Sequence, residues 1–290
     1  MPYHEPEQQL NEEEFRLIRD LIYNHCGLYF DADSKYLLDR RLLQRLAHHK
    51  LAGFREYYQF LKYDRKKEEE IADIMDLLTT NETYFFREAF QLRAFTDEIL
   101  PELMQLKQRE RTLRIWSAGC STGEEPYTIA MLMLELDCFQ GWRIEIVGSD
   151  ISQRVVQHAR KGIYGKSSFR ATDERYLKRY FTEAEGGGYR VCDAVRERVT
   201  ISQMNLFDAN RLALLGKMDV IFCRNVIIYF DQASKKRVIE SFHNTLRSGG
   251  YLLLGHSESL MNISTAFALR HLKNDMVYQK TGDICGGVAK

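Results

Sequence analysis

The residues best suited to chemistry lie in the segment "WSAGCSTGEEPYTIA", residues 116–130, where an apolar run meets a turn of small residues. Two adjacent carboxylates, Glu124 and Glu125, then open an apolar helical stretch. A strand that leads through a glycine-rich turn into a helix is where α/β sheets bind nucleotides. This turn matches neither GxGxxG nor GxxxxGK[ST], and it lacks the phosphate-binding lysine. It therefore does not favour a triphosphate ligand.

The position of Glu125 narrows the class of ligand. Near the start of a helix it would repel a pyrophosphate, but it could bind hydroxyl or ammonium groups. The positive end of a helix dipole also favours carboxylates in the first turn without any ligand. From this segment alone, the functional and the structural explanations remain equally open.

Another acidic side chain, Asp150, follows the next expected strand in "RIEIVGSDIS", residues 143–152. An acid at this place commonly accepts hydrogen bonds from ribose hydroxyls, although it could instead cap the helix expected from Ser152. Together the two sites indicate a nucleoside without a diphosphate. S-adenosylmethionine, which has a ribose and a cationic amino-acid end, fits this description. Glu124 or Glu125 could bind its amino group directly or through a water molecule.

Two further segments combine polar and aromatic side chains. The segment "LLTTNETYFFREAF", residues 77–90, joins the two halves of the chain, and "IFCRNVIIYFD", residues 221–231, includes the end of a buried apolar run. Ligands bind at the carboxyl edge of such sheets. A capped loop and a buried aromatic pair would explain the same residues without a ligand.

The elements that must position these residues divide the chain into two parts. Residues 11–79 have helical periodicity, with Leu37, Leu38, Leu42 and Leu46 on one stripe and Ser34 as a candidate N-cap. From residue 113 onward, apolar runs alternate with helical stretches, which predicts an α/β domain with a mostly parallel sheet. The expected strands lie at 113–118, 143–150, 218–226 and 250–255, and the expected helices at 125–137, 152–160 and 232–247.

An irregular segment interrupts this alternation between Gly162 and Thr200. Strand-like runs flank the turn 186–188, which predicts a small antiparallel β-subdomain at about residues 163–199. Two short strand-like runs around Asn274 predict a closing hairpin. The expected domains are a helical domain at 1–79, a linker with a connecting helix at 80–111, and the α/β domain at 112–290.

Composition and charge restrict the class of protein. Of the 290 residues, 44% are hydrophobic and 28% are charged, as in globular proteins. We find no apolar run long enough for a membrane span, and the acidic N-terminus does not predict a secretory signal. The six cysteines have neither CxxC nor metal-site spacing, so we expect free thiols in a reducing cytoplasm and no metal.

The net charge is zero, but its distribution is uneven. Residues 34–67 carry ten Lys/Arg against three Asp/Glu, a local excess of seven positive charges. Such an asymmetry indicates a surface that meets an anionic partner, although a solvated basic helix face would look the same.

In these motifs the chain resembles the chemotaxis receptor glutamate methyltransferases, the CheR-type family. The segments "TTNETYFFRE", "WSAGCSTGEEPYTIA", "SDIS", "FCRNVIIYFD" and "LLLGHSES" occur in the order typical of that family. The resemblance covers nearly the whole chain. It implies an all-α N-terminal domain followed by a class I S-adenosylmethionine-dependent methyltransferase domain, a Rossmann-like α/β fold with an inserted antiparallel β-subdomain.

The resemblance also implies roles for individual residues. Arg87 and Tyr229 would lie near the transferred methyl group, as catalytic residues. Arg40, Arg41 and Arg45 would face the acidic cytoplasmic coiled-coil region of a chemotaxis receptor. The residues implied to bind the cofactor are Asn81, Thr83, Arg87, Gly119, Glu125, Asp150, Asn205, Leu206, Arg224 and Asn225.

The implied reaction moves a methyl group from a sulfonium to a glutamate carboxylate. That carboxylate is already ionised at neutral pH, so no general base is needed. His256 in "GHSES" is the nearest candidate base, but we interpret it as structural. The loop "TEAEGGGYRV" is shorter than in family members that bind a receptor's C-terminal pentapeptide, so we do not expect such a tether.

Three other functions have less support. A nucleic-acid methyltransferase would need a larger basic groove than a neutral chain with one basic helix offers. A nicotinamide-dependent dehydrogenase would need the missing GxGxxG fingerprint. A cofactor-binding scaffold without catalysis is disfavoured by the intact motifs, and it remains open at this point.

Overall fold

The computed structural model describes residues 9–79 and 81–281. The chain divides into two compact units. The helical unit comprises Met1–Thr80 together with Tyr229–Ser234, and the sheet unit comprises Asn81–Ile228 together with Lys235–Lys290.

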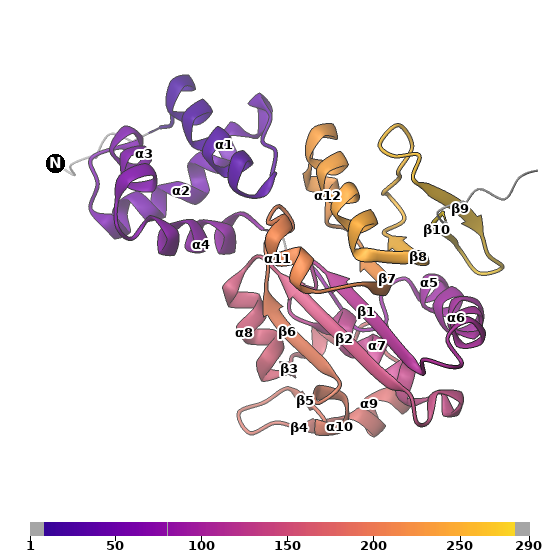
Figure 1. The fold of residues 1–290 in the computed structure, drawn as a ribbon. Coiled ribbons are helices and arrows are strands. Elements are labelled where there is room, and N and C mark those ends of the chain that lie inside the picture. The colour runs from indigo at the N-terminus through magenta and orange to yellow at the C-terminus, as the bar shows by residue number, and fades with distance from the viewer. Residues whose placement is uncertain (1–8, 80, 282–290) are drawn as a thin grey trace, which may run out of the picture. The chain divides into compact units, whose positions relative to one another are not determined.

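The helical unit is built from α1 to α4 (Figure 1). Helix α1 begins with a capping box, in which Asn11 and Glu14 each accept a hydrogen bond from the other's backbone N–H. Of the predicted apolar stripe of α2, Leu38, Leu42 and Leu46 are buried in the core of this unit, whereas Leu37 is only half-buried. The bounds are α1 Glu12–Cys26, α2 Lys35–His49, α3 Phe54–Tyr63 and α4 Lys67–Leu78.

The start of α2 differs from the expectation. Ser34 precedes the helix, but its side chain makes no capping hydrogen bond. Its N–H and its Oγ both donate to the carboxylate of Asp31, which caps the short helix η1 Ala32–Ser34. Ser34 therefore occupies the predicted N-cap position, but its hydroxyl donates to the Asp31 carboxylate and does not cap α2.

A buried carboxylate, Glu70 of α4, links three helices of the helical unit. Its side chain is only 2% exposed and pairs with Arg45 of α2, whose Nε donates across 2.8 Å. His49 of α2 and Tyr57 of α3 also hydrogen-bond to Glu70, and Arg45 pairs further with Asp73. Because a buried charge is costly without partners, loss of Arg45 would destabilise the packing of α2, α3 and α4 around Glu70.

The sheet unit is built on a seven-stranded sheet in the order β6-β2-β1-β7-β8-β10-β9. The first five strands in this order are parallel, and β10 is antiparallel to both neighbours. The predicted α/β fold and its closing hairpin are thereby confirmed. The strands are β1 Thr112–Ala118, β2 Arg143–Asp150, β6 Val199–Gln203, β7 Met218–Cys223, β8 Leu246–Leu254, β9 Phe267–His271 and β10 Met276–Lys280.

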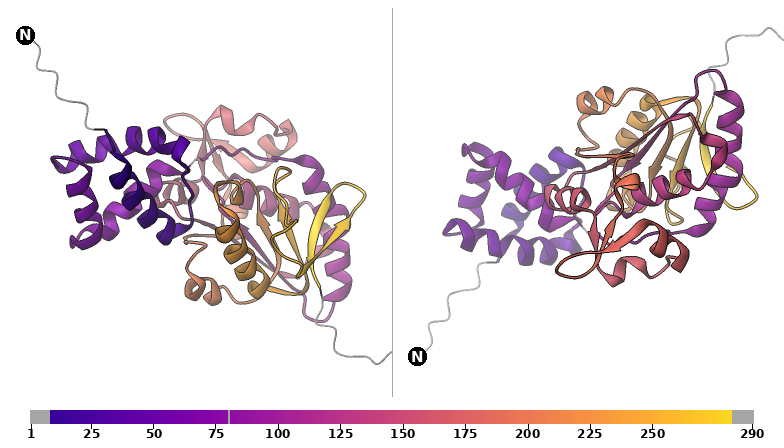
Figure 2. Two further views of the ribbon diagram at one scale, coloured as in Figure 1. Left: turned by 90° about the horizontal axis from the view of Figure 1, so that it is seen from above. Right: turned by 90° about the horizontal axis from the view of Figure 1, so that it is seen from below.

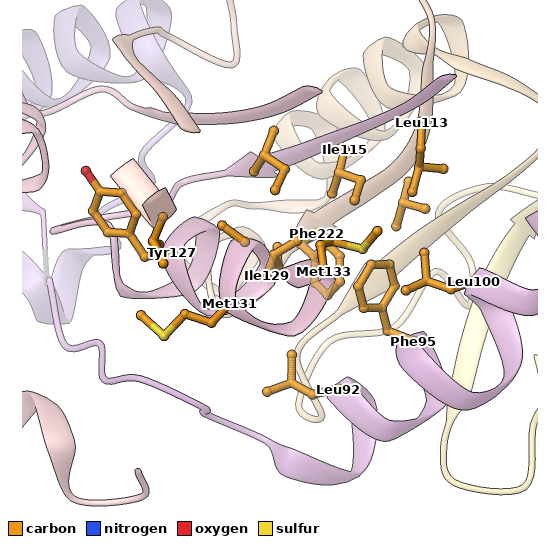
Figure 3. Packing of buried hydrophobic residues seen from close by; sticks show 14 of the residues in the cluster. Leu92, Phe95, Leu100, Leu113, Ile115, Tyr127, Ile129, Met131, Met133 and Phe222 are labelled. Carbon is orange, nitrogen blue, oxygen red and sulfur yellow. The ribbon is translucent and has the colours of Figure 1, made fainter. Parts of the chain in front are cut away.

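The helices of the sheet unit cover both faces of the sheet. On one face of β1, Leu113 and Ile115 belong to a buried cluster with Phe95 and Ile129 (Figure 3). On the other face, the Trp116 ring packs against Phe242 of α12, with ring centroids 5.4 Å apart. The helices are α5 Ala89–Ala94, η2 Phe95–Ile99, α6 Leu100–Leu106, α7 Glu124–Leu134, α8 Gln153–Lys161, α9 Glu174–Tyr180, α10 Asp193–Arg196, α11 Ala209–Leu214 and α12 Gln232–Thr245.

The insert carries a separate three-stranded antiparallel sheet in the order β3-β5-β4 (Figures 1 and 2). The predicted antiparallel subdomain is thereby confirmed. Its strands are β3 Ile163–Tyr164, β4 Phe181–Glu183 and β5 Tyr189–Val191.

The apolar pattern of the sequence does not predict one strand of the main sheet. Strand β6 lies directly after the insert and reads VTISQ, with Ile201 as its one buried residue. It is half-exposed because it forms an edge of the sheet, so it lacks the continuous apolar run that marks the buried strand β7.

Three further observations, on membrane spans, cysteines and metal ligands, apply to the described residues only. No helix there is long and apolar enough to cross a membrane. The five cysteines within these ranges are unpaired, and Cys285 lies outside them. Within the same ranges, no group of three or more His, Cys, Asp or Glu side chains could hold a metal ion.

Candidate active site

The turn after β1 packs closely against its neighbours. The N–H groups of Gly119 and Cys120 both donate to the carbonyl oxygen of Ser149, each across 2.8 Å. Gly119 has φ +77°, and a Cβ placed there would lie 2.4 Å from Cγ2 of Val226. Glycine is required at this position because both the backbone conformation and the available space exclude a side chain.

Asp150, at the carboxyl end of β2, holds this turn. Its carboxylate accepts hydrogen bonds from the N–H of Ser121 at 2.8 Å and from that of Ser152 at 3.0 Å. The residue that caps α8 is Ser152, whose Oγ accepts from the N–H of Val155. The capping explanation for Asp150 is therefore wrong. Its carboxylate joins the ends of β1 and β2.

Glu125 lies beside a positive charge. One carboxylate oxygen accepts from Oγ of Ser117 at 2.6 Å, and the other accepts from Nε of Arg224 at 2.6 Å. The side chains of Glu125 and Arg224 are only 12% and 4% exposed. The Arg224 guanidinium therefore offsets the Glu125 charge within the protein. A carboxylate is tolerated in this turn because its charge is paired.

Glu124 has different surroundings from its neighbour. It is 2% exposed, and its carboxylate accepts from the hydroxyls of Thr122 at 2.6 Å and Ser168 at 3.0 Å. Burial raises the pKa of the Glu124 carboxyl above its ordinary value of 4.5. Of the two acids considered for the cofactor's amino group, Glu124 is thus bound to the insert, while Glu125 is bound to Arg224.

The raised pKa of Glu124 predicts a pH-dependent stability. The folded state binds the proton more tightly, so the stabilising contribution is fully present below pH 4.5 and is lost as the pH rises through the folded pKa. We expect E124Q to lack this decline. Its unfolding free energy should therefore increase relative to that of the parent protein as the pH rises. Urea unfolding of both proteins between about pH 4.5 and 8 measures the difference.

The comparison of the two proteins isolates Glu124. Burial also raises the pKa of Glu258, but that residue is present in both proteins and its contribution cancels. A difference in unfolding free energy that stays constant across the pH range would contradict the prediction.

Arg224 also contacts the segment 81–88, which precedes α5. Its Nη1 donates to the carbonyl oxygen of Arg87 at 2.8 Å. The Arg87 side chain in turn donates from Nη1 to the carbonyl oxygen of Glu82 at 3.0 Å. Asn81 and Thr83 lie in the same segment and are half-buried. Thr80, within the polar segment singled out from the sequence, lies outside the described residues.

Asn225 adopts a left-handed backbone conformation, with φ +60°. The half-buried carboxylate of Glu258 accepts hydrogen bonds from the N–H groups of Asn225, Val226 and Gly255, at 2.8, 2.9 and 2.7 Å. The Asn225 Oδ1 atom is buried and has no hydrogen-bond partner among the described residues. An orphaned acceptor at the carboxyl edge of the sheet fits a ligand that carries hydroxyl or ammonium donors.

Asn205 and Leu206 follow β6. The N–H of Met204 donates to the carbonyl oxygen of Asp150 at 2.8 Å, which brings this turn beside the end of β2. The Asn205 Oδ1 accepts from the N–H of Phe207 at 2.9 Å, and Leu206 is buried. The residues implied to bind the cofactor thus all lie in the sheet unit, either at the carboxyl ends of the parallel strands and in the turns and first helical turn that follow them, or in the segment before α5.

The remaining residues of interest lie in the helical unit. Tyr229 belongs to the segment 229–234 that groups with this unit, and it is 38% exposed. Its proximity to the methyl group stays a prediction. In α2, Arg40 is exposed, whereas Arg41 donates to the carbonyl oxygen of Leu78 at 2.8 Å and Arg45 pairs with Glu70.

Sequence reasoning assigned no role to three residues that build the site. Ser117 and Ser168 are single hydroxyls in apolar or irregular segments, and nothing in the pattern pairs them with Glu125 and Glu124. Glu258 lies in the quoted "LLLGHSES" segment. An acid in the turn that follows an apolar strand, here four residues after the end of β8, was the signal that could have identified it.

Comparison with known families agrees with this architecture. Residues 81–276 match the family model described as "CheR methyltransferase, SAM binding domain". Residues 13–79 match the model described as "CheR methyltransferase, all-alpha domain". Together the two matches span both units of the chain.

Similar proteins come from several bacteria. "Chemotaxis protein methyltransferase 2" of Vibrio cholerae is 38% identical over 93% of this chain and 94% of its own length. "Chemotaxis protein methyltransferase" of Borreliella burgdorferi is 35% identical over 84% and 87%. "Chemotaxis protein methyltransferase 1" of Pseudomonas aeruginosa is 33% identical over 92% and 97%. These alignments extend along nearly the full length of both partners.

Solved structures resemble the chain only weakly. A magnesium protoporphyrin IX methyltransferase from Synechocystis with bound SAM aligns at 13% identity and a TM-score of 0.34, over 77% of this chain and 94% of that one. Family membership therefore depends on the sequence matches.

Proposed function

Because this chain belongs to the CheR methyltransferase family, we propose that it transfers the methyl group of S-adenosylmethionine to glutamate side chains of chemotaxis receptors. The product is a γ-carboxyl methyl ester, and the modified glutamates lie in the receptors' cytoplasmic coiled-coil region. The observation that carries the proposal is the set of acidic and amide acceptors at the carboxyl edge of the sheet, Glu125, Asp150 and Asn225.

These acceptors fit S-adenosylmethionine better than a phosphorylated nucleotide. Carboxylates and an orphaned amide oxygen bind hydroxyl and ammonium groups, whereas they repel phosphates. When bound, the cofactor supplies a methyl group on a positively charged sulfur. In this assignment, Asp150 accepts from the ribose and Glu125 faces the amino group, while Asn205 and Leu206 line the adenosine side.

The substrate carboxylate needs orientation rather than deprotonation. A glutamate has a pKa of roughly 4.3 and is ionised at neutral pH. His256 is more than half exposed, and its Nε2 lies 3.4 Å from Asp275. Because the substrate carboxylate needs no deprotonation, we assign His256 a structural role. Arg87 orients the incoming carboxylate, and Tyr229 shapes the path of the methyl group. Exclusion of water favours the reaction because opposite charges are neutralised as it proceeds.

A methyl-transfer assay tests the proposed function. The purified protein is incubated with radiolabelled S-adenosylmethionine and a receptor cytoplasmic fragment, and the labelled fragment is then treated with mild base. We expect label on the receptor that base releases as methanol, because esters hydrolyse and methylated amines do not. A fragment with its acceptor glutamates changed to alanine is the control. Label that survives base, or that enters RNA instead, would contradict the proposal.

The basic face of α2 is proposed to dock the acidic receptor, with Arg40 as its most available member. We expect Arg40→Ala to raise the KM for receptor by about three- to tenfold at low ionic strength, with kcat unchanged, because only an exposed charge is lost. Added salt should remove the difference between variant and parent. Initial rates at several salt concentrations measure the effect.

The variant Arg45→Ala provides the contrast to Arg40→Ala. It pairs with the buried Glu70, so Arg45→Ala should lower the unfolding free energy by about 3–5 kcal/mol. Any loss of receptor methylation in that variant would reflect destabilised packing of the helical unit. The docking role of α2 fails if Arg40→Ala leaves the KM for receptor unchanged at low salt.

Two finer features of the partner and the location are part of the proposal. The short loop between β4 and β5 does not support a pentapeptide tether, so docking depends on the helical unit. The unpaired cysteines among the described residues support a cytoplasmic location.

A further inference from the structure

The insert is joined to the turn that precedes α7 by two side-chain hydrogen bonds. The Tyr164 hydroxyl of β3 donates to the carbonyl oxygen of Thr122 at 2.6 Å. The Ser168 hydroxyl donates to the carboxylate of Glu124 at 3.0 Å. Tyr164 is 1% exposed and Glu124 is 2% exposed, and both bonds are partly buried. Bonds of this kind hold their partners firmly because the alternative is an unsatisfied buried group.

The same part of the insert also holds the segment 81–88. The N–H of Phe85 donates to the carbonyl oxygen of Ser168 at 2.9 Å. The Phe85 ring packs edge-on against Tyr164, with centroids 4.9 Å apart, and stacks on Phe169 at 5.2 Å. Nearby, Arg170 pairs with Glu82 at 2.7 Å. The insert residues Tyr164 and Ser168 therefore contact two of the segments from which cofactor ligands are expected, the turn 119–125 and the segment 81–88.

The backbone of these two segments needs external support. Phe86, Glu88 and Ser121 all have positive φ angles, of 59°, 57° and 49°. Non-glycine residues pay a free-energy cost in this region and stay there only when their surroundings hold them. Gly123 is tightly packed as well, since a Cβ at this position would lie 3.1 Å from the Tyr164 hydroxyl. The insert supplies part of this support, beside Asp150 and Arg224.

We propose that Tyr164 and Ser168 are positioning residues, through which the inserted β-subdomain sets the affinity of the enzyme for S-adenosylmethionine. They act on the cofactor indirectly, by fixing the turn 119–125 and the segment 81–88. The proposal goes beyond methyl transfer itself and depends only on S-adenosylmethionine being the cofactor. It gives the insert a role in every turnover that is independent of any receptor contact.

Direct binding of the demethylated product S-adenosylhomocysteine, measured by calorimetry, tests the proposal without a receptor. The test variant combines Tyr164→Phe, which keeps the ring packing, with Ser168→Ala. We expect its Kd to rise by about tenfold, the effect of losing two hydrogen bonds that fix the site. At saturating cofactor, kcat should stay within about twofold of the parent, because the reacting groups are intact.

Two further variants separate positioning from general damage to the insert. Tyr189→Phe removes a hydroxyl from the same small sheet, where Tyr189 packs on Phe169, and it should leave the Kd unchanged. Ser168→Thr retains a hydroxyl and, combined with Tyr164→Phe, should recover part of the affinity. A Kd of the double variant within twofold of the parent's overturns the proposal, as does an equal rise in Tyr189→Phe.

The outcome is distinguishable from failure of the proposed function. A parent protein that binds S-adenosylhomocysteine but methylates no receptor fragment refutes the proposed substrate and leaves the positioning role standing. A parent that binds no S-adenosylhomocysteine refutes both.

Discussion

Replacing Arg87 by alanine should lower kcat by about 100-fold or more, while the Kd of S-adenosylmethionine changes by only a few-fold. The Arg87 guanidinium is proposed to orient the glutamate carboxylate, and misplacement of a reacting group by an ångström costs about this much. The Arg87 carbonyl oxygen, which accepts from Arg224, is retained in the variant. The cofactor side of the site should therefore survive the substitution.

Single-turnover methylation and calorimetry measure the two quantities separately. Arg93→Ala is the matched control, because Arg93 is an exposed arginine on α5 whose guanidinium lies over the Phe90 ring. It should retain the parent's kcat. An Arg87→Ala enzyme whose kcat is intact would remove Arg87 from the catalytic residues.

The second large effect is expected when Arg224 of the Glu125–Arg224 pair is replaced. Arg224→Met leaves the Glu125 carboxylate almost buried without its cation, which should lower the unfolding free energy by about 3–5 kcal/mol. It also removes the bridge from β7 to the segment 81–88, so kcat/KM should fall by about 100-fold or more. Urea unfolding and steady-state kinetics test the two parts.

A double-mutant cycle with Glu125→Gln separates stability from function. The double variant has no unpaired charge, so most of the lost stability should return. The activity of the double variant should not return, because both the Glu125 carboxylate and the Arg224 guanidinium would be absent from the cofactor site. Arg224→Lys is the conservative control, and it should rescue stability better than activity, since an ammonium cannot donate in the same forked geometry. Additive stability effects in the cycle would contradict the charge-pair explanation.

The sequence predicted the fold well where periodicity was strong. The buried strand β2 and the helical stripe of α2 were both predicted, because each buries a regular apolar face. Periodicity did not predict strand β6, because an edge strand buries little. The π-helical turns of η2, Phe95–Ile99, were also not predicted, since a single extra residue in a helix leaves the apolar pattern nearly unchanged.

The site was predicted only in part. Strand ends identified Asp150 and Arg224, because parallel strands bring their carboxyl ends to one edge. The partners of buried charges could not be predicted, since pairs such as Glu125 with Arg224 are 99 residues apart in the chain. In α2, too, the partners of charged side chains could not be predicted from the sequence. Its three arginines have different surroundings, and only Arg40 is exposed.

The glycine turn between β4 and β5 has a practical consequence. A Cβ at Gly186 or Gly187 would meet nothing within 4 Å, whereas one at Gly188 would lie 2.8 Å from the carbonyl oxygen of Tyr164. The tip of this hairpin is therefore open on its outer side and fixed at its base. An epitope tag or a fluorophore-bearing peptide spliced between Gly186 and Gly187 should be accommodated without disturbing Tyr164, giving a labelled enzyme for tracking in living cells.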